Sequence, residues 1–144
     1  MLLKILSFRQ YLMCSMVFLC ITLYSCSKSS NNAPSTPPQI AFKQISGYVY
    51  HDTTITQNTY FRVGIESSRV SGSDLLKYLY IYASYDGKPD SLINYIHLYG
   101  ATADSYNDVL GFVSRNQGGT EKYTFTILTQ GGLTNSVSAT VNVH

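Results

Sequence analysis

Hydrophobic residues recur at every second position beyond residue 40, in short blocks separated by Gly, Asn, Asp and Ser. This period is typical of antiparallel strands with one buried face, because successive side chains of a strand point to opposite sides of the sheet. The same region shows no convincing helical period. The blocks predict strands over residues 40–42, 46–50, 59–66, 76–85, 91–99, 105–114, 122–128 and 136–143.

About seven such strands within residues 40–144 predict an all-β domain, an immunoglobulin-like antiparallel β-sandwich. The paired glycines in residues 129–132 predict the turn of the last hairpin, because glycine accepts the positive φ of tight turns. The alternation also predicts which side chains point inward: Phe61, Val63, Ile65, Leu79, Ile81, Ala83, Tyr123, Phe125, Ile127, Val137, Ala139, Val141 and Val143.

Tyr123 stands two residues before Phe125, which is the spacing between the corner tyrosine and the second core cysteine of immunoglobulin domains. On that interpretation, Phe125 fills with apolar volume the place of a disulfide. The other interpretation is that Tyr-x-Phe is simply a favourable strand pattern. The sequence does not decide between these two interpretations.

The N-terminal residues have the layout of a secretory signal. Lys4 and Arg9 precede the mostly apolar residues 11–23, a stretch shorter than the roughly 20 residues of a spanning helix. We therefore predict a signal peptide over residues 1–25. The alternative is an uncleaved anchor helix over residues 2–23, with Cys26 as an ordinary thiol.

Leu23-Tyr24-Ser25-Cys26 resembles a bacterial lipobox, from which Tyr24 departs. The resemblance implies a lipid anchor on Cys26 and attachment to a membrane of the cell envelope, with the outer membrane favoured. The sequence leaves open whether the domain lies on the periplasmic side or on the cell surface. Residues 26–39 hold the lipidated Cys and a Ser/Asn/Pro-rich segment, which predicts a flexible linker. Residues 27–144 contain no cysteine and cannot form an internal disulfide.

Charge excludes one class of partner. The net charge of +2 comes from Lys4 and Arg9, so the part beyond the signal is close to neutral. A nucleic-acid-binding protein normally presents a basic face, and we therefore expect no nucleic-acid partner.

The order of motifs from Gly47 onward is similar to a group of short Bacteroidota lipoproteins. These motifs are GYVY, DTTIT, FRVGI, a YDG turn, GTEKYTFTILT and SVSATVNV. Members of the group consist of a signal, a stalk and one immunoglobulin-like domain, and they have no assigned activity. The resemblance covers most of residues 45–144 and implies the fold and the location, but no site residues.

The best candidate for a binding site is a row of tyrosines. Tyr78, Tyr80 and Tyr82 alternate with inward residues and are expected on the outside of one sheet. Tyr95 and Tyr99, with His97 between them, extend the row if their strand pairs alongside. Tyrosine is a rigid amphipathic contact residue, suited to sugar rings or a partner protein. The alternatives are that tyrosine only favours strands, or that a loop covers the row.

Other candidate chemistry is weak. Asp86 with Asp90, and Asp104 with Asp108, are better explained by turns than by a calcium loop. The three histidines have no metal-ligand spacing, so we predict no metal, and no cofactor other than the lipid. No catalytic motif is present. Asp52-Thr53-Thr54 and Asp90-Ser91-Leu92 resemble the Bacteroidota O-glycosylation acceptor, which is a hint at Thr53 or Ser91.

Together these observations predict a non-enzymatic lipoprotein of the cell envelope that displays one immunoglobulin-like domain as an interaction or structural module. Its partners would be the membrane, through the lipid, and an unidentified protein or glycan. The alternative is a glycan-binding accessory lipoprotein that uses the tyrosine row. An enzyme is a distant third hypothesis.

Overall fold

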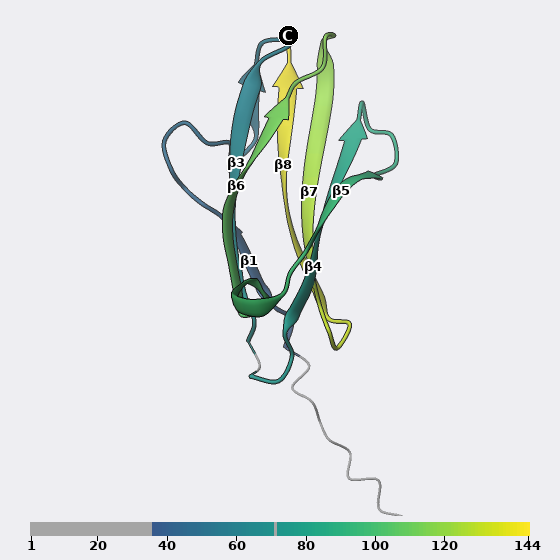
Figure 1. Ribbon diagram of the computed structural model, residues 1–144. Helices are drawn as coiled ribbons and strands as arrows, with labels where there is room; N and C mark the ends of the chain where they lie inside the picture. Colours follow the sequence, from purple (N-terminus) through teal and green to yellow (C-terminus); the bar gives the residue numbers. More distant parts are fainter. Residues whose placement is uncertain (1–35, 71) are drawn as a thin grey trace, which may run out of the picture. The chain divides into compact units, whose positions relative to one another are not determined.

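The computed structural model describes residues 36–70 and 72–144. The predicted signal peptide, Cys26 and most of the predicted linker lie outside this part of the chain. Strands make up almost all of the regular structure within it (Figure 1). They are β1 (Gln39–Phe42), β2 (Thr53–Ile55), β3 (Tyr60–Ser68), β4 (Leu76–Tyr85), β5 (Ser91–His97), β6 (Ser105–Val113), β7 (Gly119–Thr129) and β8 (Thr134–Val143), with one 3-10 turn, η1 (Gly100–Ala103), between β5 and β6.

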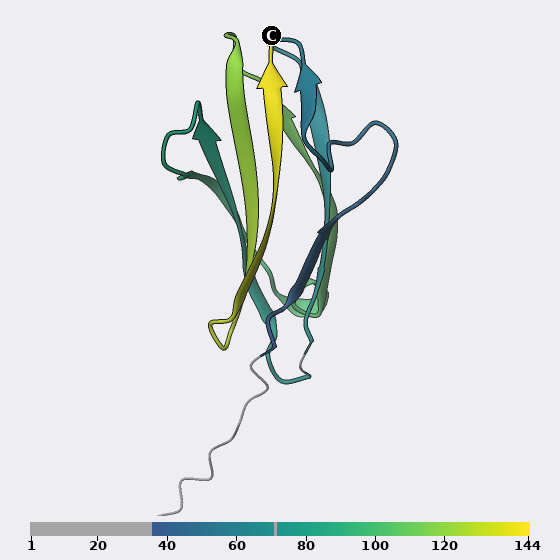
Figure 2. The ribbon, with the colours of Figure 1, turned by 180° about the vertical axis from the view of Figure 1, so that it is seen from behind.

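The strands form two sheets that face each other (Figures 1 and 2). One sheet has the order β1-β3-β6 and the other the order β2-β8-β7-β4-β5. Neighbouring strands are antiparallel except for β2 and β8, which run parallel. This arrangement confirms the predicted immunoglobulin-like sandwich, because β1, β3 and β6 lie in one layer while β4, β7 and β8 lie in the other.

The core is built from every other side chain of the facing strands. Val63 and Ile65 of β3 meet Phe125 and Ile127 of β7 in one cluster, and all four are almost completely buried. Phe125 also contacts the ring of Phe42, at 5.9 Å between centroids. The predicted inward set is therefore confirmed, although Val137 is only half-buried. The residues between them, such as Arg62 and Lys122, are exposed, as a period of two requires.

The predicted strand over residues 46–50 is wrong. Gly47 has a φ of +84°, and the amide of Tyr48 donates to the carbonyl of Ile45 at 3.1 Å, which closes a turn. Among the described residues, one backbone hydrogen bond joins this segment to β3, from Val49 N–H to Arg62 O at 2.8 Å. The strand preference of Tyr and Val is thus overridden by a backbone conformation that is incompatible with a ladder.

The short strand β2 was missed. Thr53 pairs with Val141 and Ile55 with Val143, in the parallel direction. A strand of three residues is too short to show an alternation of apolar and polar positions. Its parallel pairing at the edge of the sheet also depends on where β8 ends, which no local pattern indicates. The predicted strand over residues 91–99 is also two residues too long, because β5 ends at His97 and Leu98 turns inward to be buried.

The domain begins before the end of the predicted linker. Pro38 is buried, and its carbonyl accepts a hydrogen bond from Asn135 Nδ2 at 2.9 Å. Gln39 opens β1 opposite Ser68. Gln39, the last residue of the predicted linker, therefore belongs to β1, and Pro38 packs against the domain just before it.

Candidate functional site: an aromatic face on β4 and β5

The tyrosine row lies on the outer face of the five-stranded sheet. Tyr78, Tyr80 and Tyr82 are half-exposed and alternate along β4 with buried residues. Strand β5 places Tyr95 opposite Tyr80 and His97 opposite Tyr78, and paired residues of adjacent strands share a face. We name these five side chains the aromatic face. The tertiary structure thus joins residues that are up to 19 positions apart in the sequence.

The rings of the aromatic face touch in an unbroken series. The ring centroids are 6.3 Å apart from Tyr82 to Tyr80, 5.6 Å from Tyr80 to Tyr78, and 5.0 Å from Tyr78 to His97. Tyr95 lies beside the series, 6.0 Å from Tyr78 and 6.5 Å from Tyr80. All these spacings fall in the range of favourable aromatic pairs. The rings therefore hold one another in place.

The phenol groups of the aromatic face take no part in hydrogen bonds with the described residues. In the described part of the chain, the hydroxyls of Tyr78, Tyr80, Tyr82 and Tyr95 have no hydrogen-bond partner. Tyr95 is 58% exposed. These hydroxyls are therefore free to exchange hydrogen bonds with solvent or with a ligand.

Tyr99 extends the series from outside the strand. It precedes η1 as its N-cap residue, with extended backbone, and Thr102 Oγ1 accepts a hydrogen bond from its amide at 2.9 Å. Its ring lies 5.8 Å from that of His97 and is 74% exposed. Tyr99 thus contacts one end of the aromatic face without pairing to β4.

Hydroxyl side chains flank the aromatic face on its other side. Strand β7 places Thr126 beside Tyr80 and Thr124 beside Tyr82, and β8 adds a serine opposite each threonine. We name this set the hydroxyl column: Thr124, Thr126, Ser136 and Ser138. Thr126 and Ser136 share a hydrogen bond of 2.8 Å. Thr124 Oγ1 is covered and has no partner among the described residues.

A second polar cluster, which sequence reasoning missed, lies between the β4–β5 turn and the start of β7. Glu121 is 0% exposed. Its Oε1 accepts hydrogen bonds from Arg115 N at 2.8 Å and Arg115 Nε at 3.0 Å, and its Oε2 accepts one from the Tyr123 hydroxyl at 2.7 Å. Three donors thus compensate a buried carboxylate, which would otherwise be costly.

Asp86 completes this cluster from the β4–β5 turn. The guanidinium of Arg115 donates to both of its carboxylate oxygens, at 2.8 and 3.0 Å, and the amide of Thr120 donates at 2.9 Å. The hydrogen bond from Arg115, followed by that from Thr120, holds the pKa of Asp86 well below its usual range. We name the set Arg115, Asp86, Glu121 and Tyr123 the Arg115 cluster.

The Arg115 cluster accounts for two local features. Asp86 lies in a turn, as expected, with φ of +54° followed by +74° at Gly87. Gly119 has φ of +146°, and a Cβ there would collide with Asp86 and Arg115. The sequence did contain a signal for Glu121. It stands two positions before Tyr123, the first predicted inward residue of β7, so the period of two directs its side chain into the core as well.

Tyr123 does not make the contact of an immunoglobulin corner tyrosine, whose hydroxyl bonds to backbone. Its hydroxyl bonds to a side chain, Glu121, and its ring packs against those of Phe61 and Phe112 at 5.6 and 4.9 Å. Burial, followed by the hydrogen bond to Glu121, raises the pKa of the Tyr123 phenol. The residue is therefore a core side chain with a fixed polar partner.

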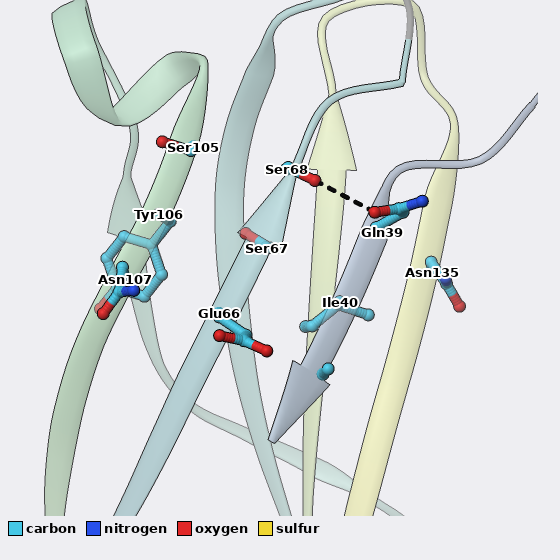
Figure 3. Close-up of a pocket in the computed structure, with 10 residues that line it drawn as sticks. Gln39, Ile40, Glu66, Ser67, Ser68, Ser105, Tyr106, Asn107 and Asn135 are labelled. Atoms are coloured by element: carbon cyan, nitrogen blue, oxygen red, sulfur yellow. Dashed lines mark hydrogen bonds between the residues drawn. The ribbon is translucent and has the colours of Figure 1, made fainter. Parts of the chain in front are cut away.

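A separate pocket of about 550 Å³ lies where β1, β3 and β6 approach the start of β8 (Figure 3). Among its lining residues, Ser68 Oγ donates to Gln39 Oε1 at 3.4 Å, while the buried Ser67 Oγ has no partner in the described part of the chain. The pocket belongs largely to the three-stranded sheet, so it is distinct from the aromatic face.

The remaining predicted positions are dispersed. Within residues 36–70 and 72–144, no group of three or more His, Cys, Asp or Glu side chains is placed to hold a metal ion. The two suggested modification sites differ, since Ser91 opens β5 and is exposed, whereas Thr53 is half-buried in β2. Next to Thr53, Asp52 Oδ1 accepts a hydrogen bond from the Thr140 amide at 2.8 Å, which gives this acid a structural role.

Helices of membrane-spanning length and hydropathy do not occur in the described residues.

Comparison with known proteins adds information on the fold alone. No family model and no curated protein matches the sequence. Among solved structures, Spo0M, a sporulation control protein from Bacillus subtilis, matches with a TM-score of 0.52 and 9% identity, over 76% of this chain and 50% of that chain. At this identity the likeness supports the sandwich fold and says nothing about chemistry.

Two further solved structures are similar at a lower level. A superoxide reductase (neelaredoxin) from Ignicoccus hospitalis has a TM-score of 0.49 and 9% identity, over 76% of this chain and 81% of that chain. The CARDB domain of the PF1109 protein from Pyrococcus furiosus has a TM-score of 0.39 and 12% identity, over 73% of this chain and 89% of that chain.

Proposed function

We propose that this protein is a non-enzymatic lipoprotein of the cell envelope whose sandwich domain is an interaction module. The lipobox-like residues 23–26 supply the membrane anchor at Cys26, and the Ser/Asn/Pro-rich segment that follows serves as the tether. The aromatic face is the contact surface of the module.

The observation that carries the proposal is the exposed aromatic face itself. Tyrosines that merely stabilise a sheet need no free hydroxyl groups, yet four phenols here have none of their hydrogen bonds satisfied by the described residues. Tyr95 and Tyr99 are also more than half exposed. Rigid aromatic rings with free polar tips are typical of contact surfaces, because they bind with little loss of conformational entropy.

The anchor is tested by fractionation. We expect Cys26→Ala to block lipid attachment, so that the protein is no longer processed as a lipoprotein and leaves the outer-membrane fraction. Cys20→Ala changes a neighbouring cysteine of the apolar stretch and should have no effect. Globomycin, which inhibits lipoprotein signal processing, should change the mobility of the wild-type chain. Unchanged fractionation of Cys26→Ala would contradict the anchor.

The contact surface is tested by photo-crosslinking in intact cells. A photoreactive amino acid at position 95 should give crosslinked products, because Tyr95 is the most exposed tyrosine of the aromatic face. The control position is Tyr60, which is 61% exposed on β3 of the other sheet. Equal products from both positions, or none from either, would remove the aromatic face as the contact surface.

A further inference from the structure

We propose that the aromatic face binds a neutral glycan chain, which lies along β4 with its sugar rings stacked on the tyrosines. This inference rests on the proposed contact role of the face and names its ligand. Three features of the face support it: the spacing of its rings, the neighbouring hydroxyl column and its lack of charge.

The first feature is the linear series of rings. Tyr82 and Tyr78 are four residues apart, which corresponds to roughly 13 Å along a strand. The rings of Tyr82, Tyr80, Tyr78 and His97 follow one another at 5.0 to 6.3 Å. The electron-rich face of an aromatic ring attracts weakly positive C–H groups, and the C–H face of a pyranose ring presents such groups. A row of rings therefore offers successive stacking positions to successive sugar units.

The second feature is the hydroxyl column beside the rings. Thr126 and Ser136 are exposed enough to exchange their mutual hydrogen bond of 2.8 Å for bonds to a ligand. The free phenol groups of the aromatic face add donors and acceptors on the same surface. A sugar unit stacked on a ring carries hydroxyl groups around its edge. These hydroxyl groups can form hydrogen bonds with the hydroxyl column and the phenol groups while the apolar face of the sugar contacts the ring.

The third feature is charge. The aromatic face and the hydroxyl column contain no acidic residue, and the cation of Lys77 stands at one end, 5.6 Å from the Tyr78 ring. Nucleic-acid binding takes most of its affinity from several cations on phosphates. A neutral chain needs none, and the rings and hydroxyl groups themselves carry none. The exposed Lys122 lies beyond them, two residues before Thr124 on β7. The chemistry of the face therefore fits an uncharged ligand.

The dimensions of the face favour a chain molecule over a globular protein. Two strands about 4.8 Å apart, carrying a row roughly 13 Å long, present on the order of 100 Å² of ring surface. A stable protein interface buries about 800 Å² on each partner. A strip of this width is large enough for a single polysaccharide strand.

Affinity electrophoresis in gels containing one polysaccharide tests this inference. The full-length protein in detergent is run through gels with a β-glucan, a mannan, a xylan or an α-glucan, and with polygalacturonate as a charged comparison. We expect retardation by at least one of the four neutral polymers. Replacing Tyr78, Tyr80 and Tyr82 together by alanine should weaken it by more than about tenfold, because an aromatic stacking contact is worth about that factor or more.

Two further variants separate stacking from folding. Replacing the same three tyrosines by phenylalanine preserves the rings, so binding should persist. Tyr60→Ala removes an exposed tyrosine from the other sheet and should leave binding unchanged. Near-UV circular dichroism and thermal unfolding show whether the alanine variant is folded, and single alanine variants replace it if it is not.

The inference is overturned if no neutral polymer retards the wild type, if polygalacturonate alone does, or if the alanine variants bind equally well. It is also overturned if the phenylalanine variant loses as much binding as the alanine variant. The crosslinking at position 95 distinguishes this failure from that of the proposed function. Crosslinks to protein without glycan binding would retain the contact surface and change its ligand, and an absence of both would remove both.

Discussion

Tyr123 and Tyr80 lie on adjacent strands of one sheet, but their hydroxyl groups meet opposite surroundings. The Tyr123 hydroxyl is buried and donates to Glu121 at 2.7 Å. The Tyr80 hydroxyl has no partner in the described part of the chain. The Arg115 cluster thus satisfies its polar groups internally, whereas the phenol groups of the aromatic face have no partner among the described residues. Hydrogen-bond partners, rather than residue type, distinguish a tyrosine that holds the fold from one available for binding.

Removal of Glu121 should have the largest effect on stability. Glu121→Ala leaves the buried Tyr123 hydroxyl without its acceptor and takes one partner from Arg115. We expect the free energy of unfolding to fall by about 3 kcal/mol, measured by urea denaturation. Glu66→Ala, at an exposed position of β3, should change it by less than about 0.5 kcal/mol. Equal urea midpoints for the two variants would show that Glu121 is not a structural group.

Deletion of single hydroxyl groups compares the two regions directly. Tyr123→Phe removes a hydrogen bond to a buried carboxylate and should cost about 2 kcal/mol. Tyr80→Phe removes a hydroxyl that has no partner among the described residues, and it should cost close to nothing. Both are measured by urea denaturation at neutral pH. A Tyr80→Phe variant as unstable as Tyr123→Phe would abolish the distinction between the two regions.

Gly119 tests how closely the Arg115 cluster is packed. Gly119→Ala introduces a Cβ at a φ of +146°, directed at Asp86 and Arg115. We expect a loss of about 1–2 kcal/mol, measured by thermal unfolding. The neighbouring Gly118→Ala meets nothing closer than 3.4 Å and is the matched control. Similar melting temperatures for the two variants would mean that the cluster tolerates displacement.

The Arg115–Asp86 pair predicts a dependence of stability on pH. Asp86 has its pKa lowered in the folded state, mainly by the hydrogen bond from Arg115. Below about pH 4, where a free aspartate takes up its proton, the unfolded chain binds that proton more readily than the folded one, so stability falls as pH falls. Above this range the contribution is fully present.

Thermal unfolding from pH 7 to pH 2 measures this contribution. The melting temperature of wild type should exceed that of Asp86→Asn by a constant amount down to about pH 5, and the difference should shrink below about pH 4. Asp90→Asn lies in the same loop and forms no ion pair among the described residues, so it is the control. A difference that grows at low pH would reverse the assigned sign.

Thr124 should give the smallest effect, with the opposite sign. Its hydroxyl is covered and has no partner in the described region. Thr124→Val replaces it by a methyl group of similar shape and should raise stability by up to about 1 kcal/mol, measured by urea denaturation. Thr126→Val instead breaks the hydrogen bond to Ser136 and should not stabilise. Destabilisation by Thr124→Val would indicate that its hydroxyl has a partner after all.

The fold was predictable because one face of each long strand is buried. The period of two in β3, β4, β7 and β8 correctly identified hydrophobic residues that point inward, although it was not extended to the buried Glu121 of β7. Where local backbone geometry decides, the prediction was wrong, as at Gly47, whose positive φ replaces the expected strand over residues 46–50 by a turn. The strand β2 was missed because its three residues form a strand by pairing with the last residues of β8, which are far away in the sequence.

The candidate site was partly predictable for the same reason. Alternation with Leu79 and Ile81 placed the tyrosines of β4 on the outer face, and the structure brings Tyr95 and His97 beside them. The Arg115 cluster was not foreseen, since Asp86, Arg115 and Glu121 come from different turns and strands. Their contacts depend on how the β4–β5 turn meets the start of β7.

The sequence by itself determined which side of each strand is apolar, because side-chain direction along a strand follows from backbone geometry alone. It also determined the neutral balance of charge in residues 26–144. The tertiary structure alone decided which strands are neighbours, and therefore which phenols are enclosed beside a carboxylate and which stand in a row at the surface. Strand order depends on contacts between residues far apart in the chain, and no local pattern of residues specifies it.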